Sequence, residues 1–240
     1  AGQQVGINIP KTSQKSVKRG MMLAAPESLH PSRFLNATLR IYKNAVAPLV
    51  NHRKVLLYIG TRGSFAQVVL MEREAIEPGD EGLAQIRLRE EIPALPGDRF
   101  VITPHFEKKI LGGGTVLEAS FFKFRGGRAK ETVAYLKALV KEDLAEAPLA
   151  YMLFFPYRPS PAEEMAKYSG RPIQKIEDAL RENEKRGKAL KIGERSYCAS
   201  DRFAGLKKET LAAGESLLEK DLLKETFNPE ELRTRLSPKM

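Results

Sequence analysis

Two groups of cationic residues flank predicted strands in the first half of this sequence. The first group stands at the entrance of one strand and in the tight turn after it, and the second group precedes a glycine run. Cationic side chains bind phosphates, and the backbone of a glycine run can approach a sugar–phosphate chain closely. For the second group, a solvated loop whose glycines only bend the chain is the alternative. The candidate nucleic-acid contacts are His52, Arg53, Lys54, Arg62, Lys108, Lys109, Gly112, Gly113 and Gly114.

No combination of residues indicates a catalytic centre or a metal site. None of the three histidines lies near a cysteine, aspartate or glutamate at metal-ligand spacing. The single cysteine, Cys198, excludes an internal disulfide and a cysteine-based metal site. Ser64 and Ser196 have no base nearby to activate them as nucleophiles. The sequence therefore predicts no catalytic residue and no metal ligand.

The composition is that of an ordinary globular chain with an excess of positive charge. Of the 240 residues, 42% are hydrophobic and 29% are charged, which is enough to bury a core in one large domain or two smaller ones. The formal net charge is +10, and residues 1–127 contribute +7 of it, with 18 Lys and Arg against 11 Asp and Glu. A basic surface favours a polyanionic partner, nucleic acid first.

The sequence contains neither a segment that could span a membrane nor a secretory signal. No apolar run approaches the roughly 18 residues that a membrane-spanning helix needs, and residues 1–10 have neither the basic start nor the apolar block of a secretory signal. The lone cysteine fits a reducing environment. We therefore expect a cytoplasmic protein with no membrane partner.

Short strand-like segments fill residues 27–120. Leu35, Ala37, Leu39 and Ile41 alternate with polar residues, as on a strand with one buried face. Pro-Gly-Asp turns at 78–80 and 96–98 precede two further segments, and the glycine run is expected to form a corner before the last one. Six strands at this spacing predict a small antiparallel barrel. The other five segments are 54–59, 64–71, 84–88, 99–103 and 115–117.

The residues before this barrel alternate over 1–9 and form a short apolar piece over 20–24. Two strands do not make a stable domain by themselves. We therefore interpret residues 1–26 as the last strands of a preceding barrel.

The second half changes to helical periodicity after a glycine-containing hinge at 121–128. Helices are predicted over about 130–143, from a capping box at Ser160 to 169, and from Pro172, with Ile173 facing inward, to Gly187. A hairpin with a two-residue turn at 193–194 follows. This order predicts a winged helix over 129–200. A long helix over about 201–226 and a helix start at 229–233 suggest that the helical repeat begins again.

In combination, these segments resemble the selenocysteine-specific translation elongation factors of bacteria. Residues 1–9 and 19–24 resemble the end of the second barrel of that family, and residues 230–233 resemble the join into a second winged helix. The resemblance covers essentially the whole chain. The segments that resemble the third barrel are 60–61, 77–85, 97–101 and 112–114.

The resemblance implies a multidomain β + α chain, in which an elongation-factor-type antiparallel β-barrel precedes a winged-helix domain made of a helix-turn-helix and a β-hairpin. The implied parts are the end of a second barrel at 1–26, a third barrel at 27–120, a hinge at 121–128, a winged helix at 129–200 and a helix opening a second winged helix at 201–240.

The resemblance also implies a function. The third barrel of the family holds the backbone of selenocysteinyl-tRNA, and Arg53 and Lys54 lie where its basic contacts are expected. The ribosome is an implied partner, and an mRNA hairpin is recognised through later winged helices that this sequence lacks. GTP and Mg²⁺ belong to a GTPase domain in this family, and no phosphate-binding Gly-x4-Gly-Lys-Ser/Thr loop is present here. We therefore expect a monomeric, non-catalytic chain without a cofactor.

Two other classes of function stay open. The helix that begins at Pro172 has the recognition position of a helix-turn-helix, so the chain could be a DNA-binding regulator whose barrel senses a signal or dimerises. A protein-interaction scaffold is the other class. That helix carries four basic and four acidic residues, and acidic groups repel a phosphate backbone, which favours a spacer or a protein contact over groove binding. Its charged residues are Lys175, Glu177, Asp178, Arg181, Glu182, Glu184, Lys185 and Arg186.

Overall fold

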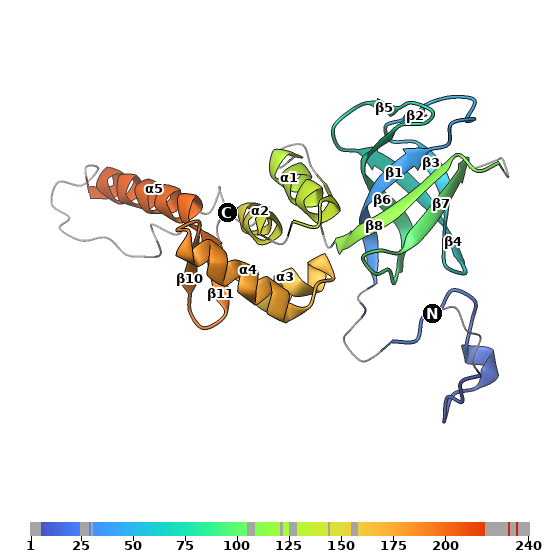
Figure 1. Ribbon diagram of the computed structural model, residues 1–240, viewed down its shortest axis with the longest axis horizontal. Coiled ribbons are helices and arrows are strands. Elements are labelled where there is room, and N and C mark those ends of the chain that lie inside the picture. Colours follow the sequence, from blue (N-terminus) through green and yellow to red (C-terminus); the bar gives the residue numbers. More distant parts are fainter. Residues whose placement is uncertain are drawn as a thin grey trace. The chain divides into compact units, whose positions relative to one another are not determined.

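In a computed structural model, the chain forms two compact units, residues 1–122 and 123–240 (Figure 1). Each unit is described by itself. The structure describes residues 6–24, 29, 31–104, 109–120, 122–124, 129–143, 145–154, 158–218, 230 and 234. The predicted hinge at 121–128 therefore lies largely outside the described residues, as does the predicted helix start at 229–233 except for Glu230, which is helical.

The first unit is built around a closed barrel of six antiparallel strands, which confirms the predicted fold. The strands follow the spatial order β1-β6-β4-β3-β7-β8, so every strand has a neighbour on both sides. Two further strands of two residues each, β2 (Leu49–Val50) and β5 (Ala75–Ile76), pair beside it. The barrel strands are β1 (Ser32–Ile41), β3 (Lys54–Ile59), β4 (Arg62–Leu70), β6 (Glu81–Ile92), β7 (Arg99–Pro104) and β8 (Gly112–Ser120).

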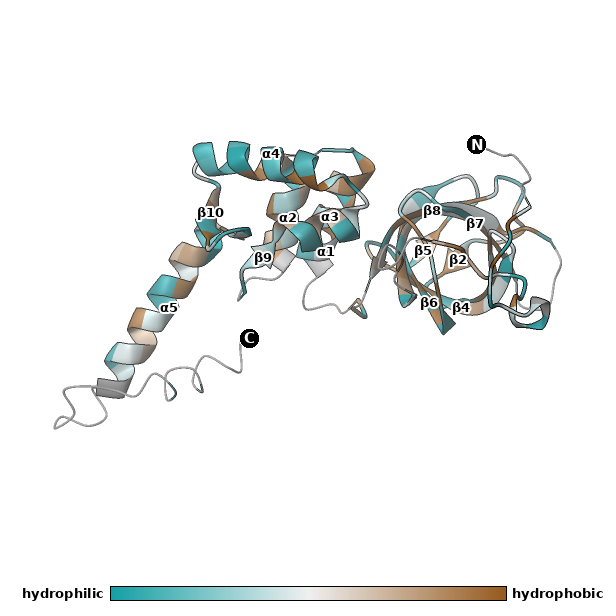
Figure 2. Cartoon of the chain, turned by 90° about the horizontal axis from the view of Figure 1, so that it is seen from below, coloured by the Kyte–Doolittle hydropathy of each residue, from teal (hydrophilic) through white to brown (hydrophobic). Residues whose placement is uncertain are grey.

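Apolar side chains from all six strands fill the barrel interior. Each strand alternates between inward and outward side chains, so the inward positions form a common core. Figure 2 shows the strands arranged in a ring around the barrel interior. The alternating residues that predicted β1 are all buried, at 0% to 1% exposure. Buried side chains from the six strands include Leu35, Leu57, Val68, Ile86, Ile102 and Val116.

The glycine run at 112–114 does not form the expected corner before the last strand. It opens β8 itself, where Gly112 lies opposite Ile41 and Ile102, and Gly114 lies opposite Leu39 and Phe100. A Cβ atom at Gly114 would overlap the carbonyl oxygen of Thr38 on β1, and one at Gly113 would lie 2.5 Å from the carbonyl oxygen of Phe100 on β7. The glycines are therefore needed because β8 passes unusually close to both neighbours where the barrel closes.

Replacing Gly114 with alanine tests this role. The added methyl group meets backbone rather than a movable side chain, so we expect a loss of several kcal/mol of stability for the barrel. Gly205→Ala is the matched control, because no atom lies within 4 Å of its Cβ position in helix α5. Chemical unfolding monitored by circular dichroism compares the two, and equal unfolding midpoints would contradict the close-packing argument.

The N-terminal segment does not form the predicted strands where the structure describes it. Residues 6–24 contain one 3₁₀ turn, Gln14–Ser16, and no strand. A strand needs a free sheet edge to pair with, and the closed barrel offers none. The structure therefore has no strand over 6–9 or 20–24, while residues 1–5 lie outside the described part and the assignment of 1–26 to a preceding barrel stays a prediction.

The second unit has the element order of a winged helix, as predicted. Helix α2 is followed by β9, α3, α4 and the hairpin β10–β11, and β9 pairs with β11 to give a three-stranded sheet. Helix α1 packs on α2, and α5 follows the hairpin (Figure 1). The bounds are α1 (Ala129–Val140), α2 (Glu146–Phe154), β9 (Ser160–Pro161), α3 (Ala162–Ser169), α4 (Ile173–Lys185), β10 (Ala189–Ile192), β11 (Ser196–Ala199) and α5 (Ser200–Leu218).

Four local predictions for this unit need correction. Helix α2 was not predicted, because its sequence is apolar on all sides and gives no helical period. Ser160 is not a capping residue: it pairs with Tyr197 of β11, and Pro161 precedes α3 without a side-chain cap. Ile173 begins α4 and is 38% exposed rather than inward. The hairpin turn has three residues, since Ile192 lies opposite Ser196.

A charged clamp joins three segments of the winged helix. Glu164 of α3 accepts hydrogen bonds from the Tyr151 hydroxyl of α2 at 2.9 Å and from both terminal nitrogens of Arg158. The Tyr151 ring also stacks on Tyr168 at 6.0 Å between centroids. Burial raises the pKa of Glu164, but the hydrogen bonds from Arg158 and Tyr151 outweigh it, so the pKa lies below the usual glutamate value.

Glu164→Ala should destabilise the winged helix by about 1–2 kcal/mol, because it removes the acceptor shared by Arg158 and Tyr151. The figure stays low since the Arg158 side chain is 44% exposed and solvent screens the pair. The matched control is Glu163→Ala, whose exposed pair with Arg195 should contribute little measurable stability.

The effect of Glu164→Ala also depends on pH. A carboxyl with a depressed folded pKa stabilises the fold above its unfolded pKa of about 4.3 and loses that contribution as pH falls through the folded value. The stability difference between wild type and Glu164→Ala should therefore be full at pH 7 and shrink below about pH 4. Thermal unfolding across pH 3–7 checks this, and a difference that grows on acidification would refute the clamp.

Candidate nucleic-acid interface

An open basic groove crosses the outer face of β3, β4 and β6. The strand register places Lys54 opposite Gln67, and Gln67 opposite Arg87. Two residue pairs further along, Phe65 of β4 faces outward beside Leu56 of β3. We call this surface the basic groove; its outward-facing lining residues are Lys54, Phe65, Gln67, Arg87 and Arg89.

An exposed aromatic ring lies among the cations of the basic groove. Phe65 is 40% exposed, and Lys54 and Arg89 are also exposed. An aromatic ring between cations suits a sugar–phosphate chain, since the cations meet phosphates and the ring can stack on a base or a sugar. The groove therefore has the chemistry of a nucleic-acid backbone site.

Three of the predicted contacts lie at or beside this groove. His52 occupies the tight turn before β3 with a φ of +62°, and its N–H donates to Asn51 Oδ1 at 3.0 Å. Gln67 donates from Nε2 to the His52 carbonyl oxygen at 3.2 Å, which ties this turn to the groove. Arg53 and Lys54 follow the turn and are exposed. The turn thus presents two adjacent cations at one end of the groove.

Sequence reasoning missed the two arginines of β6. Arg87 and Arg89 alternate with the buried Ile86 and Leu88, which is the ordinary pattern of a half-buried strand. They come near Lys54 because β6 pairs with β4 and β4 pairs with β3. The residue pattern within one strand does not encode these pairings. Their two-residue spacing was the only signal available. Burial lowers the pKa of the Arg87 guanidinium, which nevertheless remains charged at neutral pH.

Arg62 lies apart from the basic groove. It is the first residue of β4, opposite Ile59 at the far end of β3 from Lys54. Its guanidinium forms an ion pair with Glu90 at 2.9 Å. The four residues of the first predicted group therefore divide between the two ends of the β3–β4 hairpin.

The N-terminal segment covers this second end of the hairpin. Arg19 Nε donates to the Thr61 carbonyl oxygen at 3.0 Å, and the Gly20 N–H donates to Thr61 Oγ1 at 3.0 Å. Gly20 has a φ of +90°, and a Cβ there would lie 2.9 Å from Arg62 Cβ. Only glycine satisfies both the conformation and the close approach. The segment is thereby fixed on the barrel.

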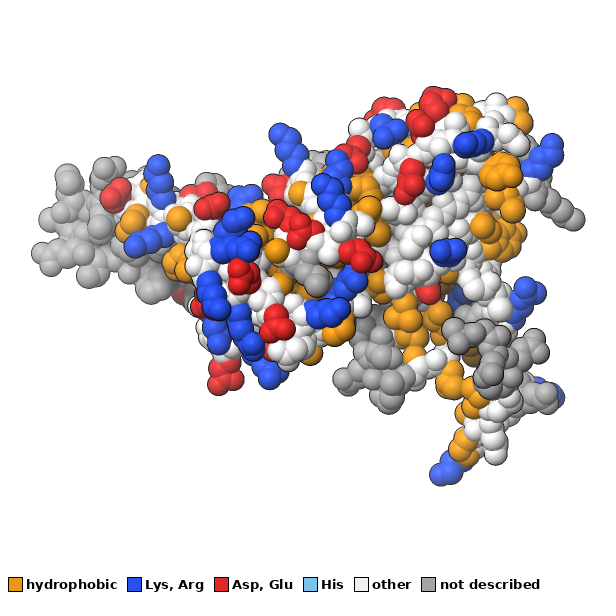
Figure 3. Space-filling model, viewed as in Figure 1, with side chains coloured by type: hydrophobic (Ala, Val, Ile, Leu, Met, Phe, Trp, Pro, Cys, Tyr) orange, Lys and Arg blue, Asp and Glu red, His pale blue; other side chains and the backbone are white. Residues whose placement is uncertain are grey.

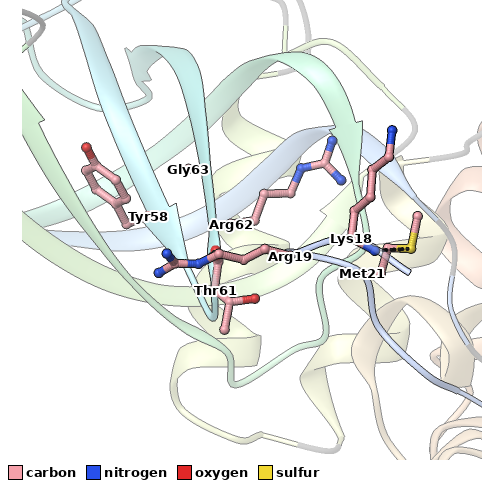
Figure 4. Close-up of a pocket in the computed structure, with 7 residues that line it drawn as sticks. All are labelled: Lys18, Arg19, Met21, Tyr58, Thr61, Arg62 and Gly63. Atoms are coloured by element: carbon pink, nitrogen blue, oxygen red, sulfur yellow. Dashed lines mark hydrogen bonds between the residues drawn. The ribbon is translucent and has the colours of Figure 1, made fainter. Parts of the chain in front are cut away.

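A pocket lies between this segment and the hairpin, and Figure 4 shows its lining. Three cationic side chains and one exposed tyrosine border it, so it is a second basic surface that the sequence did not predict. The lining residues are Lys18, Arg19, Met21, Tyr58, Thr61, Arg62 and Gly63.

Thr61→Val should release the N-terminal segment, because valine has the shape of threonine but no oxygen to accept the Gly20 N–H. Trypsin cleaves after Lys18 and Arg19 only when the backbone there can open. We expect limited proteolysis at these bonds to accelerate roughly five-fold, the effect of losing about 1 kcal/mol. Thr12→Val is the control, since Thr12 bonds only to the nearby Pro10 carbonyl oxygen. Equal cleavage rates in both variants would contradict the attachment of the N-terminal segment through Thr61.

The second predicted group is only partly described. Lys108 lies outside the described residues, and Lys109 is exposed shortly before β8. Gly112 to Gly114 lie between β1 and β7, so their backbone polar groups face two strand ladders. Their contact with a phosphate stays a prediction, and the structure gives these glycines a packing role instead.

The predicted concentration of charge in the barrel half is wrong. Residues 1–122 carry 16 Lys and Arg against 11 Asp and Glu, and residues 123–240 carry 24 against 19, so each unit has a net charge of +5. The boundary at 127 had assigned Lys123 and Arg125 to the barrel. Figure 3 accordingly shows basic side chains interspersed with acidic ones over both units. Local clustering, as in the basic groove, is what distinguishes the barrel.

Helix α4, at the recognition position of the winged helix, has its arginines in ion pairs. Arg181 pairs with Glu177 and Asp178 at 3.6 and 3.2 Å, and Arg186 pairs with Glu182 at 3.0 Å. These pairs place acidic groups beside the cations that a phosphate would need. They support the expectation that this helix suits a nucleic-acid groove poorly.

Within the described residues, no group of three or more His, Cys, Asp or Glu side chains is arranged to hold a metal ion. Over the same part of the chain, no helix combines the length and the apolar character needed to cross a membrane.

Comparisons with known proteins point to one family for the barrel. Residues 37–121 match the family described as "Selenocysteine-specific elongation factor, beta-barrel domain". A selenocysteine-specific elongation factor from Desulfomicrobium baculatum is 26% identical over 150 residues, which cover 62% of this chain and 24% of that protein. Elongation factor Tu 2 from Streptomyces avermitilis is 28% identical over 120 residues, which cover 48% of this chain and 30% of that protein.

A solved structure extends the likeness to nearly the whole chain. The crystal structure of the bacterial selenocysteine-specific elongation factor EF-Sec matches with a TM-score of 0.60 over 96% of this chain and 34% of that one. At 18% identity, this match supports the fold rather than any particular residue. The chain spans about a quarter of the length of the first of these curated relatives.

Proposed function

We propose that this chain serves selenocysteine incorporation by binding the sugar–phosphate backbone of selenocysteinyl-tRNA, because residues 37–121 match the β-barrel domain family of selenocysteine-specific elongation factors. The observation that carries the proposal is the basic groove, which Lys54, Arg87 and Arg89 line together with the exposed ring of Phe65. The groove lies inside the part of the chain that matches the family.

The groove suits a folded RNA better than a small ligand. Its cations come from β3 and β6, with β4 between them, so they form a row across the sheet and do not converge on one point. A row of cations matches successive phosphates of a backbone, and a flat, open surface leaves room for a duplex stem. Arg53 directly precedes Lys54 and is also exposed, which adds a cation near this end of the β3–β4 hairpin. The contacts bind the phosphate chain and carry little sequence information.

In this proposal, the tRNA also contacts the pocket between the N-terminal segment and the β3–β4 hairpin. Lys18, Arg19 and Arg62 border it together with Tyr58. Glu90 neutralises part of the charge of Arg62, so Lys18 and Arg19 provide most of the attraction. Lys54 of the groove and the hairpin turn of the pocket lie at opposite ends of β3, a strand of six residues that spans about 17 Å. One tRNA stem can span both.

The remaining parts of the proposal concern the larger assembly. The winged helix connects the tRNA-binding barrel with modules that read an mRNA hairpin, and the ribosome is the site of action. In this proposal, a GTPase domain of the same factor binds GTP and Mg²⁺. GTP hydrolysis needs a phosphate-binding loop, which this sequence lacks. The chain itself performs no catalytic step in this proposal.

A winged-helix DNA-binding regulator is the second candidate. The element order of residues 146–199 fits it, but the internal ion pairs of α4 oppose insertion into a DNA groove. In the described part of the chain, the clearest basic–aromatic surface lies on the barrel.

Charge reversal in the groove tests the proposal. Arg89→Glu should weaken binding of a tRNA transcript about ten-fold and reduce the salt dependence of the binding constant by about one phosphate contact. Arg73→Glu is the matched control. It changes the charge by the same amount elsewhere on the barrel, where Arg73 forms an ion pair with Asp80 at 3.9 Å. Fluorescence anisotropy across a salt series measures both.

The same titrations separate the two candidates. The proposal expects salt-sensitive tRNA binding and weaker binding to a DNA duplex and to an isolated RNA hairpin. Tight duplex DNA binding, or an Arg89→Glu variant that binds tRNA as well as Arg73→Glu does, would overturn it.

A further inference from the structure

A buried polar cluster lies on the outer side of the barrel next to the basic groove. Asn36, Gln85 and Glu118 occupy neighbouring outward positions on β1, β6 and β8, yet they are only 3%, 1% and 7% exposed. Asn36 Nδ2 donates to Glu118 Oε1 at 3.3 Å, and Gln85 Nε2 donates to Asn36 Oδ1 at 3.0 Å. Buried amides are held in one orientation by such partners.

Gln85 is the residue where three segments meet. Besides Asn36, its Nε2 donates to the carbonyl oxygen of Phe122 at 2.9 Å. Its Oε1 accepts from Arg87 Nε at 3.3 Å. Phe122 is the last residue of the barrel unit, and the chain continues from it towards the winged helix. One side-chain amide therefore joins an arginine of the basic groove to the point where the chain leaves the barrel.

We propose that Gln85 is a positioning residue that couples occupancy of the basic groove to the conformation of the segment after Phe122. The proposal rests on the proposed function, because it needs a ligand with phosphates at Arg87. A phosphate that draws the Arg87 guanidinium outward alters its bond to Gln85, and a shift of the Gln85 amide changes its bond to the Phe122 carbonyl.

The amide geometry makes the coupling directional. The oxygen and the nitrogen of one carboxamide lie in a single rigid plane, so the bond to Arg87 and the bond to Phe122 cannot reorient independently. Coupling of this kind is reciprocal: whatever RNA binding does to the exit segment, fixing that segment does to RNA affinity. Gln67, which lines the same groove, bonds to the turn at His52 instead and offers no such route.

The test is hydrogen exchange of residues 122–128 in the full chain, with and without a saturating tRNA transcript. In wild type, we expect RNA to change the exchange rates of these amides at least three-fold. Gln85→Leu should abolish that change, since leucine is similar in size but bonds to neither Arg87 nor Phe122. Gln174→Leu is the matched control, because Gln174 of α4 bonds to Asp178 and does not line the basic groove, and its RNA-dependent change should equal that of wild type.

Arg87→Lys provides a second variant if Gln85→Leu folds poorly. Lysine keeps the charge for a phosphate but lacks the Nε–H that binds Gln85, so at saturating tRNA the RNA-dependent change at 122–128 should be lost. Wild-type coupling in either variant would overturn the proposal.

Failure of this proposal is distinguishable from failure of the proposed function. If wild type binds tRNA in an Arg89-dependent manner but residues 122–128 exchange at the same rate with and without RNA, the groove is confirmed and the coupling is refuted. If no Arg89-dependent binding is seen, the proposed function has failed, and the coupling proposal fails with it.

Discussion

Closure of the barrel is the constraint on which the rest of the first unit depends. The sheet closes because β8 passes between β1 and β7 at a distance that only Gly112 to Gly114 allow. Once it is closed, every barrel strand has two neighbours and no edge is left for another strand. The N-terminal segment therefore binds through a turn, at Thr61, and a ligand must bind through outward side chains. The same closure fixes the register that aligns Lys54, Gln67 and Arg87.

Much of this architecture could be predicted because strand alternation is a local property. The buried face of β1 follows from its sequence, and the exposed turn before β3 follows from its polar residues. The basic groove could not be predicted in the same way. Arg89 and Phe65 belong to different strands, and only the pairing of β4 with β6 makes them neighbours. The role of the glycine run likewise depends on β7 and on β1, which lies about 70 residues earlier in the chain, so a local pattern does not distinguish a bend from a close approach.

The two units distribute charge in different ways although their net charges are equal. On α4 of the winged helix, arginines are matched with acidic neighbours one helical turn away, which stabilises the helix and reduces its attraction for phosphates. In the basic groove, cations of β3 and β6 flank β4, which contributes an exposed aromatic ring. This contrast assigns RNA binding to the barrel and a connecting role to the winged helix in the proposed function. Gln85, bonded to Arg87 and to the Phe122 carbonyl, lies where these two roles would meet.

The most direct measurement of the central claim is photo-crosslinking from the groove itself. Phe65 is exposed and lines the basic groove, so it can be replaced by p-benzoylphenylalanine with little disturbance of the core. Tyr42, which is 60% exposed elsewhere on the barrel, provides the reference position. The account predicts a salt-sensitive crosslink between position 65 and the stem of a bound tRNA, well above that from position 42. Equal crosslinking from the two positions, or none from position 65 under conditions where tRNA binds, would contradict it.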